Sequence, residues 1–121
     1  MSELSGLELR HLRYFVAVAE ELNLSRAARQ LHISQPPLTR QIQQLEAVIG
    51  AQLFTRTARG MALTEAGKVL LEEAGNVLSF TRQAVERTRS VAMGKVGRLD
   101  IAGFGSMMLD AVPQFLARFR A

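Results

Sequence analysis

The 121-residue sequence contains no cysteine and no tryptophan. Without cysteine the chain can form neither a disulfide nor a thiolate metal site, and such a composition fits the reducing cytoplasm. There is no run of about 18 apolar residues, which excludes a transmembrane helix. The N-terminus also lacks a positive stretch followed by an apolar core, so we expect no signal peptide. We therefore predict a cytoplasmic protein that does not contact a membrane.

A catalytic arrangement of side chains is also missing. The two histidines, His11 and His32, have no acidic neighbours at metal-ligand spacing, and we interpret both as structural or surface residues. The acidic pairs Glu20–Glu21 and Glu72–Glu73 are adjacent on predicted helix faces, where carboxylates are normally solvated. The sequence therefore predicts a protein that is not an enzyme, with no catalytic residue, no metal site and no cofactor.

Acidic residues are scarce in one particular part of the chain. The net charge is only +4, but Glu46 is the single acid between Asn23 and Gly60. Five arginines lie in the same stretch: Arg26, Arg29, Arg40, Arg56 and Arg59. Arginine is suited to planar contacts with phosphates and bases. This stretch is therefore the candidate surface for a nucleic acid.

Residues 23–46 predict two short helices that meet at a tight turn. Ser25 is the expected N-cap of the first helix and Ser34 that of the second. Pro36 and Pro37 then fall in the first turn of the second helix, where the backbone N–H groups have no intrahelical partner. One apolar stripe of that helix is formed by Leu38, Ile42, Leu45 and Ile49. Only residues 31–33 separate the helices, which is the length of a helix-turn-helix corner.

The other face of the second helix is polar and lacks carboxylates. It carries Gln35, Thr39, Arg40, Gln43 and Gln44. Glutamine can pair with an adenine edge and arginine with guanine, while Pro36 offers an apolar contact to a thymine methyl group. This pattern predicts a recognition helix in the major groove of DNA. The alternative is an ordinary solvated helix face.

His32 lies in the corner just before this helix. Besides the structural or surface role given above, it could contact the DNA backbone.

A hairpin is predicted after the second helix. Residues 53–54 and 61–63 have the character of short strands, with residues 55–60 as the turn between them. This is the form of a wing, in which Phe54 would pack on the core. Arg56 and Arg59 would then reach phosphates or a narrow minor groove. The alternative is that these arginines only keep the hairpin soluble.

Two longer helical patterns flank these elements. Residues 7–22 predict a helix with one apolar face, formed by Leu12, Phe15, Val16, Ala19 and Leu22. Residues 64–93 contain no proline and predict a long helix that begins at Thr64. Its seven-residue repeat has a first row of Leu71, Leu78 and Val85 with Ala74, Thr81 and Thr88 between them, and a second row of Leu70, Val77, Ala84 and Val91. Such a repeat predicts pairing with a second copy of the helix. The alternative is packing on the chain's own domain.

The run NLSRAARQLHISQPPLTRQIQQLE resembles the DNA-binding signature of the LysR-type transcriptional regulators. The matching positions are Ser25, Ala27, Ala28, Leu31, Ser34, Gln35, Pro36, Pro37, Leu38, Thr39, Ile42, Leu45 and Glu46. The flanking segments also look like this family, so the resemblance covers essentially the whole chain. It implies that bases are read by Gln35, Pro36, Thr39 and Arg40. Ser25 and Arg26, at the start of the first of the two helices, are expected to hold phosphates. Ser34, Pro37 and Gln43 complete the predicted DNA-binding set, together with Arg56 and Arg59 of the wing.

The expected fold class is mainly α, a winged helix-turn-helix with a long dimerising linker helix. We expect a DNA-binding domain over 1–63, the linker over 64–93, and a hinge with the truncated start of an α/β effector-binding domain over 94–121. In this last segment, residues 98–103 predict a strand and residues 107–119 a helix.

The resemblance also implies the partners. A homodimer would bind an interrupted palindromic operator in double-stranded DNA, and the complete protein would form a homotetramer that responds to a small-molecule effector. The opening ELRHLRYFVAVAEELN and the QPPL core look most like family members that control the breakdown of aromatic compounds. The competing hypothesis is a winged-helix module for dimerisation or protein interaction that does not read DNA.

Overall fold

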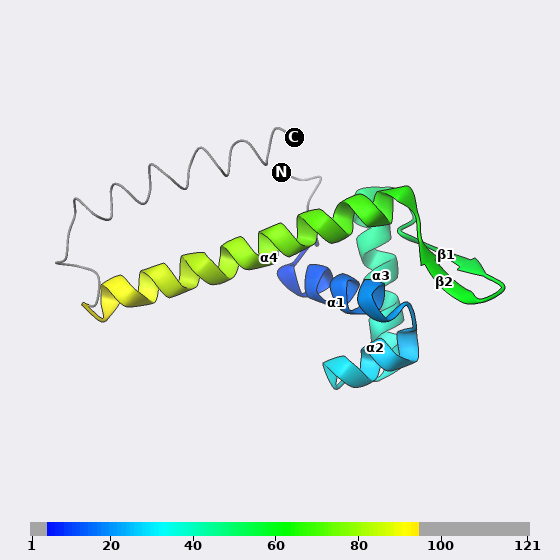
Figure 1. Ribbon diagram of the computed structural model, residues 1–121, viewed down its shortest axis with the longest axis horizontal. Helices are drawn as coiled ribbons and strands as arrows, with labels where there is room; N and C mark the ends of the chain where they lie inside the picture. Colours follow the sequence, from blue (N-terminus) through cyan, green and yellow to red (C-terminus); the bar gives the residue numbers. More distant parts are fainter. Residues whose placement is uncertain (1–4, 95–121) are drawn as a thin grey trace. The chain divides into compact units, whose positions relative to one another are not determined.

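The computed structural model describes residues 5–94, which form helices and one antiparallel hairpin (Figure 1). The elements in chain order are α1 (Leu9–Glu21), α2 (Leu24–Leu31), α3 (Gln35–Ile49), β1 (Phe54–Thr57), β2 (Gly60–Leu63) and α4 (Glu65–Ala92). This order confirms the predicted winged helix-turn-helix with a long helix after the wing. The predicted hinge begins at Gly94, the last described residue; the rest of the hinge, the strand over 98–103 and the helix over 107–119 lie outside the described residues.

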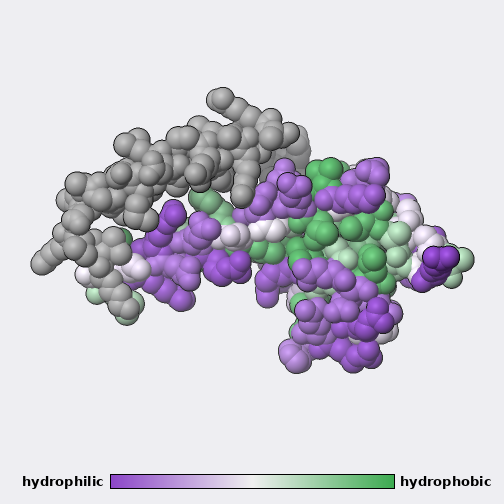
Figure 2. Space-filling model, in the orientation of Figure 1, coloured by the Kyte–Doolittle hydropathy of each residue, from purple (hydrophilic) through white to green (hydrophobic). Residues whose placement is uncertain are grey.

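The chain divides into two compact units, the first ending at Phe80 and the second beginning at Thr81. In the first unit, α1 packs against both α2 and α3, and α2 packs against α3. The largest fully buried apolar side chains at the centre of this unit are Phe15, Val18, Leu38, Leu45 and Leu53. Hydrophilic residues gather over α2, and hydrophobic ones over the part of α4 nearest the hairpin (Figure 2). The apolar stripes therefore hold the three short helices together and leave polar faces outside.

The corner between α2 and α3 has the predicted length but a different start. Asn23, not Ser25, is the N-cap of α2, and its Oδ1 accepts the backbone N–H of Arg26 at 2.9 Å. The prediction for Ser25 was wrong because Asn23 has the extended backbone and the carboxamide that an N-cap needs. His32 ends α2 with a positive φ of 59°. Residues 32–34, one position later than predicted, join the helices, and Ser34 occupies the N-cap position of α3 as expected.

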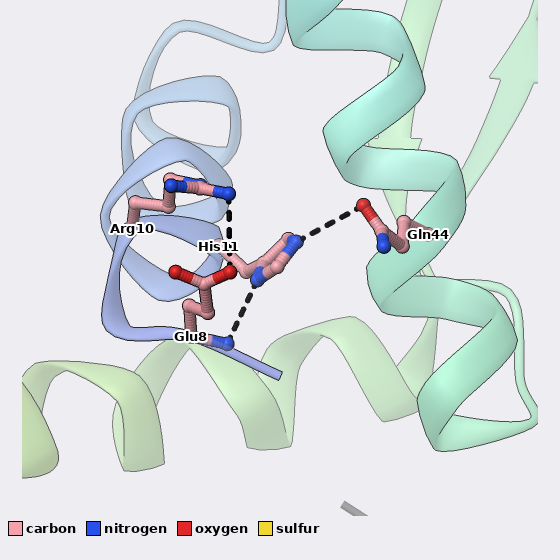
Figure 3. Close-up of polar contacts among 4 residues, drawn as sticks. All are labelled: Glu8, Arg10, His11 and Gln44. Carbon is pink, nitrogen blue, oxygen red and sulfur yellow. Dashed lines mark hydrogen bonds and ion pairs between the residues drawn. The ribbon is translucent and has the colours of Figure 1, made fainter. Parts of the chain in front are cut away.

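The start of α1 is tied to α3 through a buried histidine (Figure 3). His11 Nδ1 accepts the backbone N–H of Glu8 at 2.9 Å, and His11 Nε2 lies 3.3 Å from Oε1 of Gln44. Because a backbone N–H can only donate, Nδ1 carries no proton and the Nε2–H donates to Gln44. The structural role expected for His11 is confirmed, and Gln44 is turned toward α1. Leu22, by contrast, is the exposed C-cap of α1 and not part of its buried face.

The wing is a short hairpin with a tight turn. β1 and β2 pair antiparallel from Phe54–Leu63 to Thr57–Gly60. The strands are longer than predicted, and the turn contains only residues 58–59 instead of 55–60. The Phe54 ring packs against the Phe15 ring with centroids 5.4 Å apart, which confirms that Phe54 joins the wing to the core.

Hydrogen bonds at Leu53 join three elements around the wing. The carboxylate of Glu46 in α3 accepts the Leu53 backbone N–H at 2.7 Å. The Leu53 carbonyl in turn accepts the Thr64 N–H at 3.0 Å. Thr64 caps α4 as predicted, since its Oγ1 accepts the Gly67 N–H at 3.0 Å and donates to the Gln52 carbonyl at 2.7 Å. The wing is therefore held at its base by both α3 and α4.

The heptad positions of α4 have different surroundings in the two halves of the helix. In the first unit, Leu71 and Leu78 are half-buried against the core, and Ala74 is only 1% exposed. The prediction of a dimer contact at Ala74 was wrong, because a side chain buried in its own domain has no surface left for a partner. In the second unit, Thr81 is half-buried, whereas Val85, Thr88 and Val91 are exposed. The alternative of intramolecular packing therefore applies to the first half of α4.

Candidate nucleic-acid interface

Helix α3 has one buried and one solvent-exposed face. Leu38, Ile42 and Leu45 are buried in the core. The predicted DNA-binding positions Ser34, Gln35, Pro36, Arg40 and Gln43 are exposed, and Pro37 and Thr39 are half-buried. Gln35 is the first residue of α3, so the face begins at the helix end whose N–H groups lack intrahelical partners. The structure thus brings these side chains onto one accessible polar surface.

The surface has a positive charge because the two nearest carboxylates in the sequence, Glu21 and Glu46, are engaged by other groups. No acidic residue lies between Glu21 and Glu46 in the sequence. Glu21 forms an ion pair with Arg26 at 3.3 Å, and Glu46 accepts the N–H of Leu53. Arg40 therefore has no carboxylate partner within residues 5–94, and its charge remains available to an anion. A cationic face without compensating acids attracts a polyanion such as a nucleic-acid backbone.

A hydrogen bond between exposed side chains joins α2 to α3 beside this surface. The Ser25 hydroxyl donates to Oε1 of Gln35 at 2.9 Å. Ser25 is the second residue of α2, and Gln35 the first of α3, so the bond spans the corner between the two helices. The sequence pattern assigned Ser25 to phosphate contact and did not predict this pairing, because the two residues are ten positions apart.

Arg26 is held by the end of α1. Its Nε donates to Oε1 of Glu21 at 3.3 Å, and its Nη2 donates to the Glu21 carbonyl at 3.2 Å. The side chain remains 56% exposed, so it can still meet an anion at the start of α2. Arg26 could therefore contact a phosphate while its guanidinium stays bonded to Glu21, which sets the orientation of the side chain.

The wing presents two further cations. Arg56 lies in β1 and Arg59 in the turn, and both are exposed with no ion pair in the part of the chain that the structure describes. The hydroxyl of Thr57 accepts the Arg59 N–H at 3.2 Å and donates to the Gly60 carbonyl at 3.3 Å. Gly60 has a φ of +128°, which a residue with a Cβ atom rarely adopts. These features fix the short turn that carries Arg59.

Within residues 5–94 there is no group of three or more His, Cys, Asp or Glu side chains placed to bind a metal ion. None of the helices described between these residues combines the length and the apolar character needed to cross a bilayer.

The comparisons with known proteins agree on one protein family. The family described as "Bacterial regulatory helix-turn-helix protein, lysR family" matches residues 9–68. The HTH-type transcriptional regulator TfdT of Cupriavidus pinatubonensis is 50% identical over 115 residues, which cover 95% of this chain and 50% of TfdT. The present chain therefore spans about half the length of TfdT, and 37% of ClcR from Pseudomonas putida.

Solved structures with the same fold include complexes with DNA. The chain in the "Crystal structure of CbnR_DBD-DNA complex" is 48% identical, with a TM-score of 0.68 over 71% of this chain and 99% of that chain. The chain in the "Crystal Structure of BenM_DBD/catB site 1 DNA Complex" is also 48% identical, with a TM-score of 0.70 over 73% and 95%. The match of family, sequence and fold confirms the resemblance read from the signature in α2 and α3. This chain belongs to the LysR family of bacterial helix-turn-helix transcriptional regulators.

Proposed function

We propose that this chain binds double-stranded DNA in a sequence-specific manner and that α3 is its recognition helix. The observation that carries the proposal is the exposed, carboxylate-free face formed by Gln35, Pro36 and Arg40 at the start of α3. A helix that presents amide, apolar and guanidinium groups in this way matches the hydrogen-bonding and methyl groups of the major groove. The DNA complexes named for the CbnR and BenM domains support the same use of the fold.

Within this proposal the side chains have different tasks. Gln35, Pro36, Thr39 and Arg40 contact bases and nearby phosphates, and Ser34, Pro37 and Gln43 line the same surface. Arg26 adds a phosphate contact from the start of α2, where Ser25 was also expected to make one. Arg56 and Arg59 act from the wing, where a narrow minor groove would attract them through its enhanced negative potential.

The proposal includes a second copy of the chain. Two copies paired through α4 would present two α3 helices to half-sites separated by about one helical turn or a multiple of it, and the operator would be an interrupted palindrome. The pairing surface would use the predicted dimerisation positions that keep exposed surface, namely Leu71, Leu78, Thr81, Val85 and Thr88, together with Val91 of the second row. In the complete protein, a tetramer would respond to a small-molecule effector and regulate transcription. We place it among regulators of aromatic-compound breakdown, on the resemblance of the opening helix and the QPPL core.

The test is selection of bound sites from a random duplex library at physiological salt. We expect an interrupted palindrome to be enriched. The double substitution Gln35→Ala and Arg40→Ala should keep the fold and weaken binding to the selected site by about 100-fold, since each good side-chain-to-base pair contributes about 1–3 kcal/mol. Arg87→Ala, which removes an exposed cation from α4, is the matched control. An unenriched pool from folded protein would instead favour the interaction module.

A further inference from the structure

The side-chain amide of Gln35 makes a hydrogen bond to α2 beside the proposed interface. Its Oε1 accepts the Ser25 hydroxyl at 2.9 Å, so the carbonyl end of the amide is turned toward α2. No acceptor within residues 5–94 is bonded to Nε2 of Gln35. The hydroxyl therefore leaves both amide N–H groups available to a ligand and occupies one of the two lone pairs of the oxygen.

This orientation has a consequence for base recognition. Bidentate pairing of glutamine with adenine needs the amide oxygen as an acceptor for the adenine N6 amino group. An amide whose oxygen is engaged by Ser25 presents chiefly donors, and donors are matched by acceptors on the base edge. In the major groove, guanine offers two acceptors, N7 and O6, and thymine offers O4. Adenine offers N7 beside an amino donor that a second donor would meet unfavourably, and cytosine offers only an amino donor.

We propose that Ser25 is a positioning residue that fixes the amide of Gln35 so that it selects a keto base, guanine or thymine, at one position of each half-site. This inference rests on the proposed function and refines it. It replaces the adenine pairing and the phosphate contact that the sequence pattern suggested for Gln35 and Ser25. The two assignments for Ser25 differ in kind, because a phosphate contact affects all sequences equally while a positioning contact changes the preference at one base pair.

The experiment compares library selections for the wild-type chain, Ser25→Ala, Ser25→Thr, Gln35→Ala and the double variant. For the wild type we expect one position per half-site at which keto bases exceed amino bases by about tenfold, a typical cost of one mismatched pair. Ser25→Ala frees the amide to flip, so the ratio at that position should fall below about threefold while the other positions keep theirs. Ser25→Thr keeps the hydroxyl and should restore the ratio. The double variant should match Gln35→Ala at that position, because Ser25 acts through Gln35.

Two controls separate this role from folding. Ser25 is exposed, so Ser25→Ala should leave the melting temperature unaltered. Ser90→Ala makes the same chemical change in α4 and should leave the whole motif unaltered.

The outcomes also separate the inference from the proposed function. If the wild type enriches no motif, the proposed function fails and this inference fails with it. If the wild type selects a motif, the proposed function holds, and three results would overturn the positioning role alone. Ser25→Ala could keep the wild-type base ratio, or it could weaken binding to all sites equally. The third result is a wild-type preference for adenine or cytosine at the affected position.

Discussion

The ring of Phe54, at the start of the wing, lies against the ring of Phe15 in α1, with centroids 5.4 Å apart and planes inclined by 47°. This tilted geometry is favourable for aromatic pairs, which combine apolar burial with electrostatic attraction between ring edge and ring face. Phe15 is completely buried, so Phe54 attaches the hairpin to a fixed point in the core. The position of Arg56 and Arg59 therefore depends on a contact made by a residue that carries no charge.

We expect Phe54→Ala to destabilise the domain by about 2 kcal/mol, because a half-buried ring loses part of the 3–5 kcal/mol typical of a buried phenylalanine. Urea denaturation of wild type and variant measures this difference. DNA affinity should also fall, although Phe54 itself would touch no DNA, because the wing arginines lose their support. Phe54→Leu keeps much of the apolar volume and should have a smaller effect on both measurements. Equal stability of Phe54→Ala and the wild type would contradict the packing argument.

Most of the helical fold was predictable from the sequence because the residues that mark helix ends and the spacing of the apolar residues indicate the same elements. Pro36 and Pro37 mark the start of α3, and the spacing of Leu38, Ile42 and Leu45 gives its buried face. The wing was only approximated, since a two-stranded hairpin has few residues and its turn depends on hydrogen bonds of Thr57 that no periodicity reveals.

The parts of the interface that sequence reasoning missed are contacts between elements. The bonds from Ser25 to Gln35 and from His11 to Gln44 join residues 10 and 33 positions apart, so neither follows from the pattern of one helix. The heptad rows of α4 posed a different problem. Their spacing predicts an apolar stripe but does not show whether the stripe packs on the same chain or on a partner. In the first half of the helix, the burial of Ala74 and the packing of Leu71 and Leu78 on the core show that it packs on the same chain.

His11 provides a second prediction, about the placement of α3. His11→Ala removes the acceptor for the Glu8 N–H and the donor to Gln44, and a lost buried hydrogen-bond partner costs about 1–3 kcal/mol. Gln44→Ala removes only the 3.3 Å bond between the helices and should cost less, about 1 kcal/mol. Thermal unfolding monitored by circular dichroism checks both values. If Gln44→Ala destabilised the chain more than His11→Ala, the order of these contributions would be wrong.

The proposed dimer contact of α4 gives a third prediction. Leu78 is half-buried against the core, so Leu78→Asp should unfold the first unit instead of only separating two copies. Val85 is 44% exposed in the chain, and Val85→Asp should leave the fold intact while weakening the dimer by at least about tenfold, because a charge at an apolar seam cannot be solvated there. Sedimentation velocity across a range of concentrations measures the association. Val69→Asp makes the same change at a 63% exposed position before the repeat and serves as the control. A Val85→Asp protein that associates as tightly as the wild type would exclude Val85 from the seam.

Two glycines of α4 give opposite expectations for the same substitution. A Cβ atom added at Gly67 would overlap the backbone carbonyl oxygen of Leu53, which cannot move without disturbing its bond with Thr64. A Cβ atom added at Gly75 meets nothing within 4 Å. Alanine is favoured over glycine inside a helix by about 1 kcal/mol, so Gly75→Ala should raise the free energy of unfolding by up to this amount. Gly67→Ala should lower it despite the same gain in helix propensity, because the clash at the base of the wing exceeds that gain. Chemical denaturation of both variants tests this difference, and a stabilised Gly67→Ala protein would show that α4 is not held against Leu53 as closely as described.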